Sequence, residues 1–132
     1  MKYWLIAIAA IFLGFMSCQQ QPYQIGERLY QSQCANCHMD NGAGLGALIP
    51  PLAGADYLTS HRNELPCVIR HGLKDTIYVN GQIYAEQMQG IKSLNEIQIT
   101  NVLNYILQSW GNQGKPFTLE EVQKALQTCK VD

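Results

Sequence analysis

Apolar residues recur at helical spacing between residues 93 and 111 and predict the longest helix of the chain. The segment opens with Ser93-Leu94-Asn95-Glu96, in which a glutamate follows the serine by three positions, as in a capping box. Gly111 is expected to end the helix, because glycine readily adopts the conformation that follows a helix end. The apolar face that would enter the core consists of Ile99, Val102, Leu103, Ile106, Leu107 and Trp110.

Three further segments carry shorter structural signals. Residues 77–84 alternate apolar and other side chains about the pair Asn80-Gly81, which predicts a β-hairpin with a two-residue turn. Thr118-Leu119-Glu120-Glu121 has capping-box spacing and predicts a final helix that ends at Cys129. A short helix is expected to begin at Cys67. The pattern therefore predicts a mainly helical chain with one small hairpin.

The first seventeen residues form a separate apolar unit. One positive residue, Lys2, precedes fourteen residues without charge from Tyr3 to Met16. A membrane-spanning helix needs about 20 apolar residues, whereas the core of an export signal needs about 7 to 15. The run therefore predicts a signal peptide over residues 1–17 and an exported protein, with an uncleaved short anchor as the alternative.

The pair Ser17-Cys18 follows this run directly and precedes the polar stretch Gln19-Gln20-Gln21-Pro22. The junction resembles the processing site of bacterial lipoproteins, in which the cysteine is acylated and becomes the first residue. The resemblance implies lipidation at Cys18, a tether over residues 18–24 and a membrane-anchored lipoprotein on the periplasmic side of a bacterial membrane. Phe15 and Met16 depart from the family pattern, so cleavage elsewhere with a free thiol stays open.

Length, charge and cysteine count restrict what the remainder of the chain, after residue 24, can be. A chain of 132 residues has room for one domain, expected over residues 25–132. Nine Lys+Arg against ten Asp+Glu, with no basic run, argue against a nucleic-acid surface or a polybasic membrane patch. Five cysteines are an odd number, so at least one cannot belong to an internal pair. Export would place the others in a compartment that permits disulfides.

The motif Cys34-Ala35-Asn36-Cys37-His38 is CxxCH, the attachment signature of c-type haem. Two thiols three positions apart on one helical turn can add to the two vinyl groups of a porphyrin, and the adjacent histidine is then held under the iron. A thiol redox CxxC normally follows a strand in a βαβ unit, which is not legible here. A zinc site needs a second ligand pair at suitable spacing, which the remaining cysteines lack. The motif therefore predicts one covalent haem c.

The chain from Ile25 onward also resembles the small mono-haem (class I) cytochrome c family. Gly26 and Tyr30 form the pattern glycine, three residues, aromatic ahead of the haem cysteines, and Tyr105 occupies the place of an aromatic in the family's last helix. The resemblance implies an all-α cytochrome c fold of about four to five short helices around one covalent haem. It also implies that the first and last helices cross at Gly26, and that the hairpin lies just before the axial methionine loop.

The resemblance assigns the axial ligands of the iron as well. His38 is the proximal ligand, and its other ring nitrogen is expected to donate to the carbonyl of Pro50, with Pro51 as a one-residue ambiguity. Met88, fifty residues after His38, stands where the family carries its ligand methionine. The alternatives for the sixth position are the two other histidines, His61 and His71. His/Met ligation raises the reduction potential relative to two histidines.

Cys67 and Cys129 remain once lipid and haem have been assigned. In an exported protein the economical interpretation is a disulfide between them, which would pin the last helix to the body of the domain. Closing a loop of sixty-odd residues would contribute on the order of 4 kcal/mol in the chain-entropy model. Two buried free thiols are the alternative.

The glycines of residues 41–46, Asn-Gly-Ala-Gly-Leu-Gly, invite comparison with a nucleotide-binding loop. Such a loop needs a preceding strand and the spacing GxGxxG, and neither is present. These small residues are instead expected to let the backbone pass close to the porphyrin edge.

Together these features predict a carrier of single electrons and no enzyme. With both axial positions filled by protein, no coordination site is open for a substrate, and the expected partners are redox proteins that donate and accept electrons. Two alternatives remain open. One is a haem-based sensor or peroxidase-like protein with a labile sixth ligand, and the other is a fixed cytochrome subunit of an oxidase or dehydrogenase complex.

Overall fold

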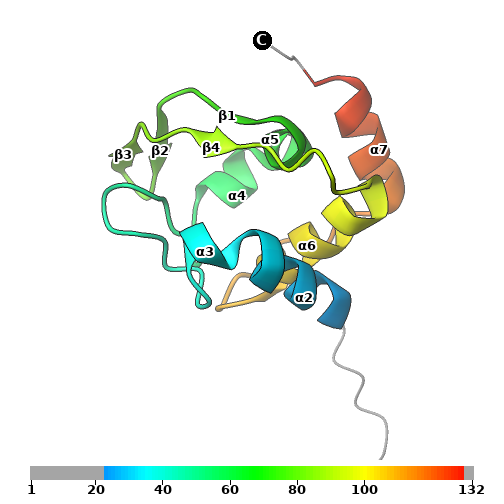
Figure 1. Cartoon of the computed structure of the whole chain (residues 1–132), viewed down its shortest axis with the longest axis horizontal. Helices are drawn as coiled ribbons and strands as arrows, with labels where there is room; N and C mark the ends of the chain where they lie inside the picture. The colour runs from blue at the N-terminus through cyan, green and yellow to red at the C-terminus, as the bar shows by residue number, and fades with distance from the viewer. Residues whose placement is uncertain (1–22, 130–132) are drawn as a thin grey trace, which may run out of the picture.

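The computed structural model describes residues 23–129, which are mainly helical (Figure 1). The expected signal peptide over residues 1–17, the lipidation site Cys18 and most of the tether lie outside the described residues. In chain order the elements are α2 (Gln24–Gln33), α3 (Ala35–His38), α4 (Tyr57–Ser60), the 3-10 helix η1 (Arg62–Glu64), α5 (Leu65–His71), β1 (Gly72–Leu73), β2 (Ile77–Val79), β3 (Gln82–Tyr84), β4 (Met88–Gln89), α6 (Glu96–Gln108) and α7 (Leu119–Gln127). Within 23–129, no helix has the length and apolar character needed to cross a membrane.

Helices α2 and α6 cross at a point where only a glycine fits. A β-carbon on Gly26 would overlap the carbonyl oxygen of Asn101 and lie 2.7 Å from Cβ of Tyr105, so the two backbones are in contact. Tyr30, one turn further along α2, is fully buried and packs against the rings of Tyr105 and Trp110, with centroid distances of 5.4 and 4.9 Å. The crossing holds α3, which follows α2 directly, beside the core (Figure 1).

The start of α6 differs from the sequence prediction by two residues. The capping box is made by Asn95, whose side chain accepts from the Gln98 backbone N–H, while the Gln98 side chain accepts from the Asn95 N–H. Ser93 lies in an exposed turn instead. This register places Leu94 just before the cap and Ile99 four positions into the helix, and both are buried in the same core. Burial of this apolar pair accounts for the shift.

The end of α6 also differs from the prediction. The helix stops at Gln108, and Trp110 and Gly111 have positive φ angles of 52° and 84°. Trp110 therefore leaves the helix, and it packs edge-on against Tyr105 at 5.6 Å. The side chain of Asn112 donates to the Ile106 carbonyl at 2.8 Å and satisfies the open helix end. The aromatic contact explains why Trp110 continues the apolar periodicity without being helical.

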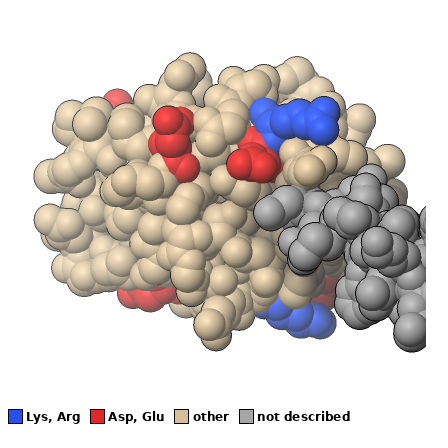
Figure 2. Space-filling view, turned by 90° about the horizontal axis from the view of Figure 1, so that it is seen from below, with Lys and Arg blue, Asp and Glu red and all other residues tan. Residues whose placement is uncertain are grey.

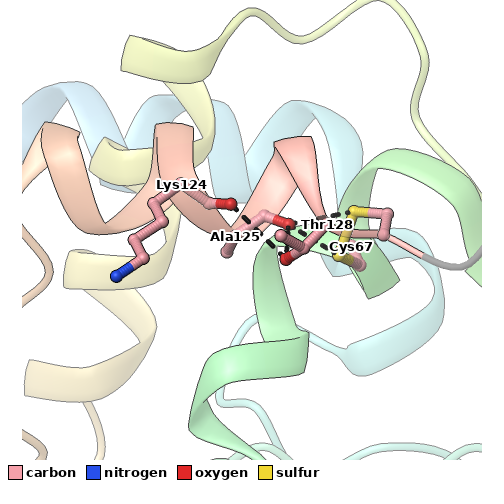
Figure 3. Close-up of a disulfide and its surroundings, with 5 residues drawn as sticks. Cys67, Lys124, Ala125 and Thr128 are labelled. Atoms are coloured by element: carbon pink, nitrogen blue, oxygen red, sulfur yellow. Dashed lines mark hydrogen bonds between the residues drawn. A yellow bond between two sulfur atoms is a disulfide. The ribbon is translucent and has the colours of Figure 1, made fainter.

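Helix α7 packs against α5 and α6 at one end of the molecule (Figure 1). It begins at the predicted capping box, since the Thr118 hydroxyl accepts from the Glu121 N–H at 3.1 Å and the Glu121 carboxylate accepts from the Thr118 N–H at 2.8 Å. It ends at Gln127, two residues earlier than predicted. Cys129 lies beyond the helix and forms a disulfide with Cys67 of α5 (Figure 3).

Two small antiparallel β-ribbons complete the fold. In one, β2 and β3 pair Ile77 with Tyr84 across a turn whose two central residues, Asn80 and Gly81, have φ angles of 52° and 77°. These angles match the two-residue turn that an Asn-Gly pair favours. In the other ribbon, β1 pairs with β4, which brings residues 72–73 against residues 88–89. The sequence pattern did not predict this second ribbon.

Candidate haem-binding site

A cavity of about 660 Å³ lies between α3, α5, α6 and the two ribbons, and its size is in the usual range for a cofactor pocket. Both cysteines of the CxxCH motif, His38 and Met88 line it. The rest of its wall is mainly apolar and includes Leu52, Leu58, Leu65, Ile69, Val79 and Leu103. The cavity therefore brings sulfur and nitrogen donors together within a mainly apolar wall.

The two cysteines lie within a single turn at the start of α3. Cys34 stands at the junction of α2 and α3, where its N–H donates to the Tyr30 carbonyl at 2.8 Å, and Cys37 lies within α3. Both are free thiols in the structure. Burial raises the pKa of Cys34 to about 11, and the proximity of Cys37 adds to this rise. A redox-active CxxC pair requires the opposite shift, because its attacking sulfur must be a thiolate near neutral pH.

His38 ends α3 and is 9% exposed. Its Nδ1 lies 3.1 Å from the carbonyl oxygen of Pro50, a contact that Pro51 does not make. Burial lowers the pKa of His38, and the bond to Pro50 opposes that shift only in part. The ring is therefore neutral at pH 7, with Nδ1–H donating to Pro50 and the lone pair on Nε2 available to a metal.

The loop after His38 holds the Pro50 carbonyl in place. The Gly44 N–H donates to the His38 carbonyl at 3.0 Å, and a β-carbon on Gly44 would overlap the carbonyl oxygen of Ile49. On Gly42 a β-carbon would lie 2.5 Å from the Trp110 ring. Neither glycine lines the cavity. Gly42 and Gly44 therefore let the loop pack on itself and on Trp110, and the approach of this loop to a porphyrin edge stays a prediction.

Met88 enters the cavity from β4, on a segment distant in sequence from the CxxCH motif. Among the described residues it is the one methionine that lines the cavity, since Met39 does not. His61 bonds to Ser60 at 2.9 Å and its ring stacks on Tyr57 at 3.9 Å, while His71 is exposed at the end of α5. Neither of these two histidines lines the cavity.

Three further residues in or next to the ribbons contribute to the site, and two of them, the glycines Gly72 and Gly90, had not been identified from the sequence. Tyr84, at the end of the hairpin, is 3% exposed, lines the cavity and donates its hydroxyl to Gln82 at 3.0 Å. Gly72 and Gly90 let β4 approach α5, since a β-carbon on either would overlap backbone of the other segment. The positive φ of 87° at Gly72 is a feature that an isolated glycine in a sequence does not reveal.

The residues present fit a covalent haem better than the alternatives. Two free thiols, a neutral imidazole and a thioether meet in one apolar cavity, and these are the groups that attach and ligate a c-type haem. Across the part of the chain that the structure describes, no three His, Cys, Asp or Glu side chains gather as a metal-binding group, so a structural zinc set is not formed there.

Comparison with known proteins agrees with this arrangement. The family model for cytochrome c matches residues 23–110. A cytochrome c-552 from Thermus thermophilus is 37% identical over 126 residues, which cover 89% of this chain and 82% of the relative. A second cytochrome c-552 from the same species is 40% identical over 108 residues, covering 75% of this chain and 82% of the relative.

The chain is also similar to one part of a larger cytochrome protein. The cytochrome c subunit of a quinone alcohol dehydrogenase from Gluconacetobacter polyoxogenes is 39% identical over 92 residues, which are 67% of this chain but 19% of that subunit. The family match, the Thermus relatives and the donor set in the cavity agree on fold and cofactor. The chain is a small class I member of the cytochrome c family, and its cofactor is covalent haem c.

Proposed function

We propose that this protein carries single electrons, using one haem c that is attached through Cys34 and Cys37 and ligated by His38 and Met88. When bound, the haem supplies an iron that alternates between the ferric and ferrous states. The protein's own part is to orient the His38 imidazole through Pro50, to present the Met88 thioether and to exclude water with the apolar wall. The observation that carries the proposal is that His38 and Met88 line the same cavity as the two thiols.

Occupation of both axial positions separates a carrier from a sensor or a peroxidase-like protein. If Met88 holds the sixth position, the reduced protein is expected not to bind carbon monoxide at neutral pH, because no coordination site is open. The measurement is the absorption spectrum of the dithionite-reduced holoprotein before and after saturation with the gas. A spectral change that saturates with carbon monoxide would contradict the carrier proposal and favour ligand binding.

We further propose that the protein is an exported lipoprotein, with a signal peptide over residues 1–17, a lipid on Cys18 and a tether up to residue 24. Replacing Cys18 by Ser is expected to move the protein from the membrane pellet to the soluble fraction, because each buried CH₂ of an acyl chain contributes about 0.8 kcal/mol to membrane binding. Gln20→Ser is the matched control and is expected to stay in the pellet. Membrane retention of a Cys18→Ser protein from which residues 1–17 have been removed would count against lipid anchoring.

The charge distribution supports docking on redox partners without strong electrostatic steering. Without Lys2, eight Lys+Arg face ten Asp+Glu, a formal net charge of -2 from 8 - 10. Figure 2 shows a face whose centre is uncharged, with only scattered acidic and basic groups toward its margins. Raising the ionic strength from about 0.01 M to 0.5 M is therefore expected to change the rate of electron exchange by less than about threefold.

This expectation is tested with native membranes that contain the donor and acceptor, by following the haem absorption at several salt concentrations. A rate that falls steeply and continuously with salt would show a strongly charged docking surface.

The alternative of a fixed complex subunit is favoured by the similarity to the quinone alcohol dehydrogenase cytochrome subunit. Mild-detergent extraction followed by native electrophoresis distinguishes a free carrier from a subunit that migrates with a larger complex.

A further inference from the structure

Helix α5 lies between α7 and the cavity. On one side, Cys67 of α5 forms the disulfide with Cys129, and both sulfur atoms lie 3.5 Å from the carbonyl oxygen of Ala125 in α7 (Figure 3). On the other side, Val68 and Ile69 of the same helix line the cavity. The disulfide therefore holds the outer face of a helix whose inner face is the cavity wall.

The end of α5 carries the strand that presents Met88. The chain passes from α5 directly into β1, where Leu73 pairs with Met88. Two residues beyond β4, the Ile91 N–H donates to the Ile69 carbonyl at 2.8 Å. A β-carbon on Gly90 would overlap backbone of residues 70–72, so the two segments are in direct backbone contact without intervening side chains. Movement of α5 is therefore transmitted directly to Met88.

A second set of contacts, made by Arg62, holds the start of α7, at the end opposite the disulfide. The Arg62 guanidinium donates to the carbonyls of Lys115 and Pro116 at 2.5 and 3.2 Å, lies 3.7 Å above the Phe117 ring and is 3.5 Å from the Glu121 carboxylate. These contacts join η1 to the start of α7. Loss of the disulfide would consequently free the end of α7 and the outer face of α5 while the start of α7 stays in place.

We propose that Cys67 and Cys129 are positioning residues for Met88, and that their disulfide restrains α5 so that β4 keeps the thioether in the cavity. The proposal rests on Met88 as the sixth ligand, as inferred above. Release of Met88 requires β4 to separate from β1 or α5 to shift with it, and the disulfide opposes the second route. The bond thus acts on ligand retention as well as on overall stability.

The test compares the haem-loaded wild type with the Cys67→Ala/Cys129→Ala double variant. Imidazole is added to the ferric protein, where its rate of binding is limited by departure of the sixth ligand. Loss of the bond is expected to raise that rate about tenfold, and to raise hydrogen exchange at the Ile91 amide by a similar factor, because local opening becomes easier. The amides of Tyr30 and Leu103, in α2 and α6, are expected to change much less.

Gly26→Ala is the matched destabilising control. A β-carbon there would overlap the carbonyl oxygen of Asn101, at the crossing of α2 and α6. This variant is expected to have a lower melting temperature than the wild type. The hydrogen-exchange rate of its Ile91 amide is not expected to rise selectively. Equal acceleration at Ile91, Tyr30 and Leu103 in the double variant would overturn the proposal, as would unchanged imidazole binding and Ile91 exchange.

Two further measurements keep the test decisive. Alkylation of the unreduced wild type should leave Cys67 and Cys129 unlabelled, and labelling at both would overturn the proposal. If the double variant does not fold, a small dithiol reagent opens the bond in the folded wild type. Its two thiols pass two electrons and two protons to the cysteine sulfurs and close into the reagent's own disulfide. Exchange at Ile91 should then rise selectively.

Failure of the proposed ligation has a different signature. If Met88 is not the ligand, the Met88→Ala variant keeps the ferric spectrum of the wild type, which overturns the His/Met assignment. Exchange at Ile91 depends on the contact between α5 and β4 and does not require ligation. A selective rise there would still show that the disulfide restrains β4, and its absence would reject the restraint itself.

Discussion

Replacing Met88 by Ala is expected to lower the reduction potential by a few tenths of a volt, within the range of about 0.8 V that axial ligands span. A thioether favours the ferrous state, so its loss stabilises the ferric state relative to the ferrous one. The haem is expected to stay attached, since Cys34 and Cys37 are unchanged. The measurements are a potentiometric titration and the Met-to-iron charge-transfer band of the ferric protein, which should disappear.

Two variants control for general effects of this substitution. Met39→Ala removes the other described methionine, which does not line the cavity, and should leave band and potential unchanged. His71→Ala tests the histidine nearest in sequence to β1, which is exposed. A band that survives in Met88→Ala would remove the His/Met assignment. If only the His71→Ala variant loses the native ligation, His71 and not Met88 would be assigned as the sixth ligand.

The Gly26→Ala variant is expected to lower the free energy of unfolding by about 2 kcal/mol or more, because overpacking costs about 1–3 kcal/mol where neighbours cannot retreat. Here the neighbours are backbone and Cβ atoms of Asn101 and Tyr105 in α6. In an unconstrained helix the same substitution would stabilise by about 1 kcal/mol. A decrease in the free energy of unfolding therefore indicates close contact between α2 and α6, whereas an increase indicates its absence. Denaturant unfolding of the holoprotein measures this free energy.

Gln31→Ala is the matched control in the same helix, at an exposed position. Its effect should stay within about 0.5 kcal/mol of the wild type. A Gly26→Ala protein as stable as the Gln31→Ala protein, or more stable, would mean that the two helices do not make the close contact described above.

The parts of the site that are coded locally could be predicted from the sequence. Cys34, Cys37 and His38 lie within five residues, and a single helical turn fixes their relation whatever the rest of the chain does. The Thr118 cap of α7 was predicted correctly for the same reason. Met88 and Pro50 come from other segments, so only the family resemblance singled them out. Their place beside His38 depends on the tertiary fold.

What could not be predicted depends on contacts between distant segments. The β1–β4 ribbon has two residues in each strand, too few to produce a periodic pattern. The close approach of Gly72 and Gly90 has no counterpart in composition, because the two glycines stand eighteen positions apart. The cap of α6 moved from Ser93 to Asn95 because burial of Leu94 outweighed an equally good local motif.

The disulfide also gives the chain a covalent ring. Residues 67–129 are closed by the bond, and the exposed hairpin tip at Asn80-Gly81 lies within the ring. An exposed loop tip is a preferred point of proteolytic cleavage. A cut there would leave the fragment that carries the CxxCH motif joined through Cys67 and Cys129 to the fragment that carries Met88. The haem cysteines and the proposed ligand are thus connected by two covalent routes, and a nicked protein remains one molecule.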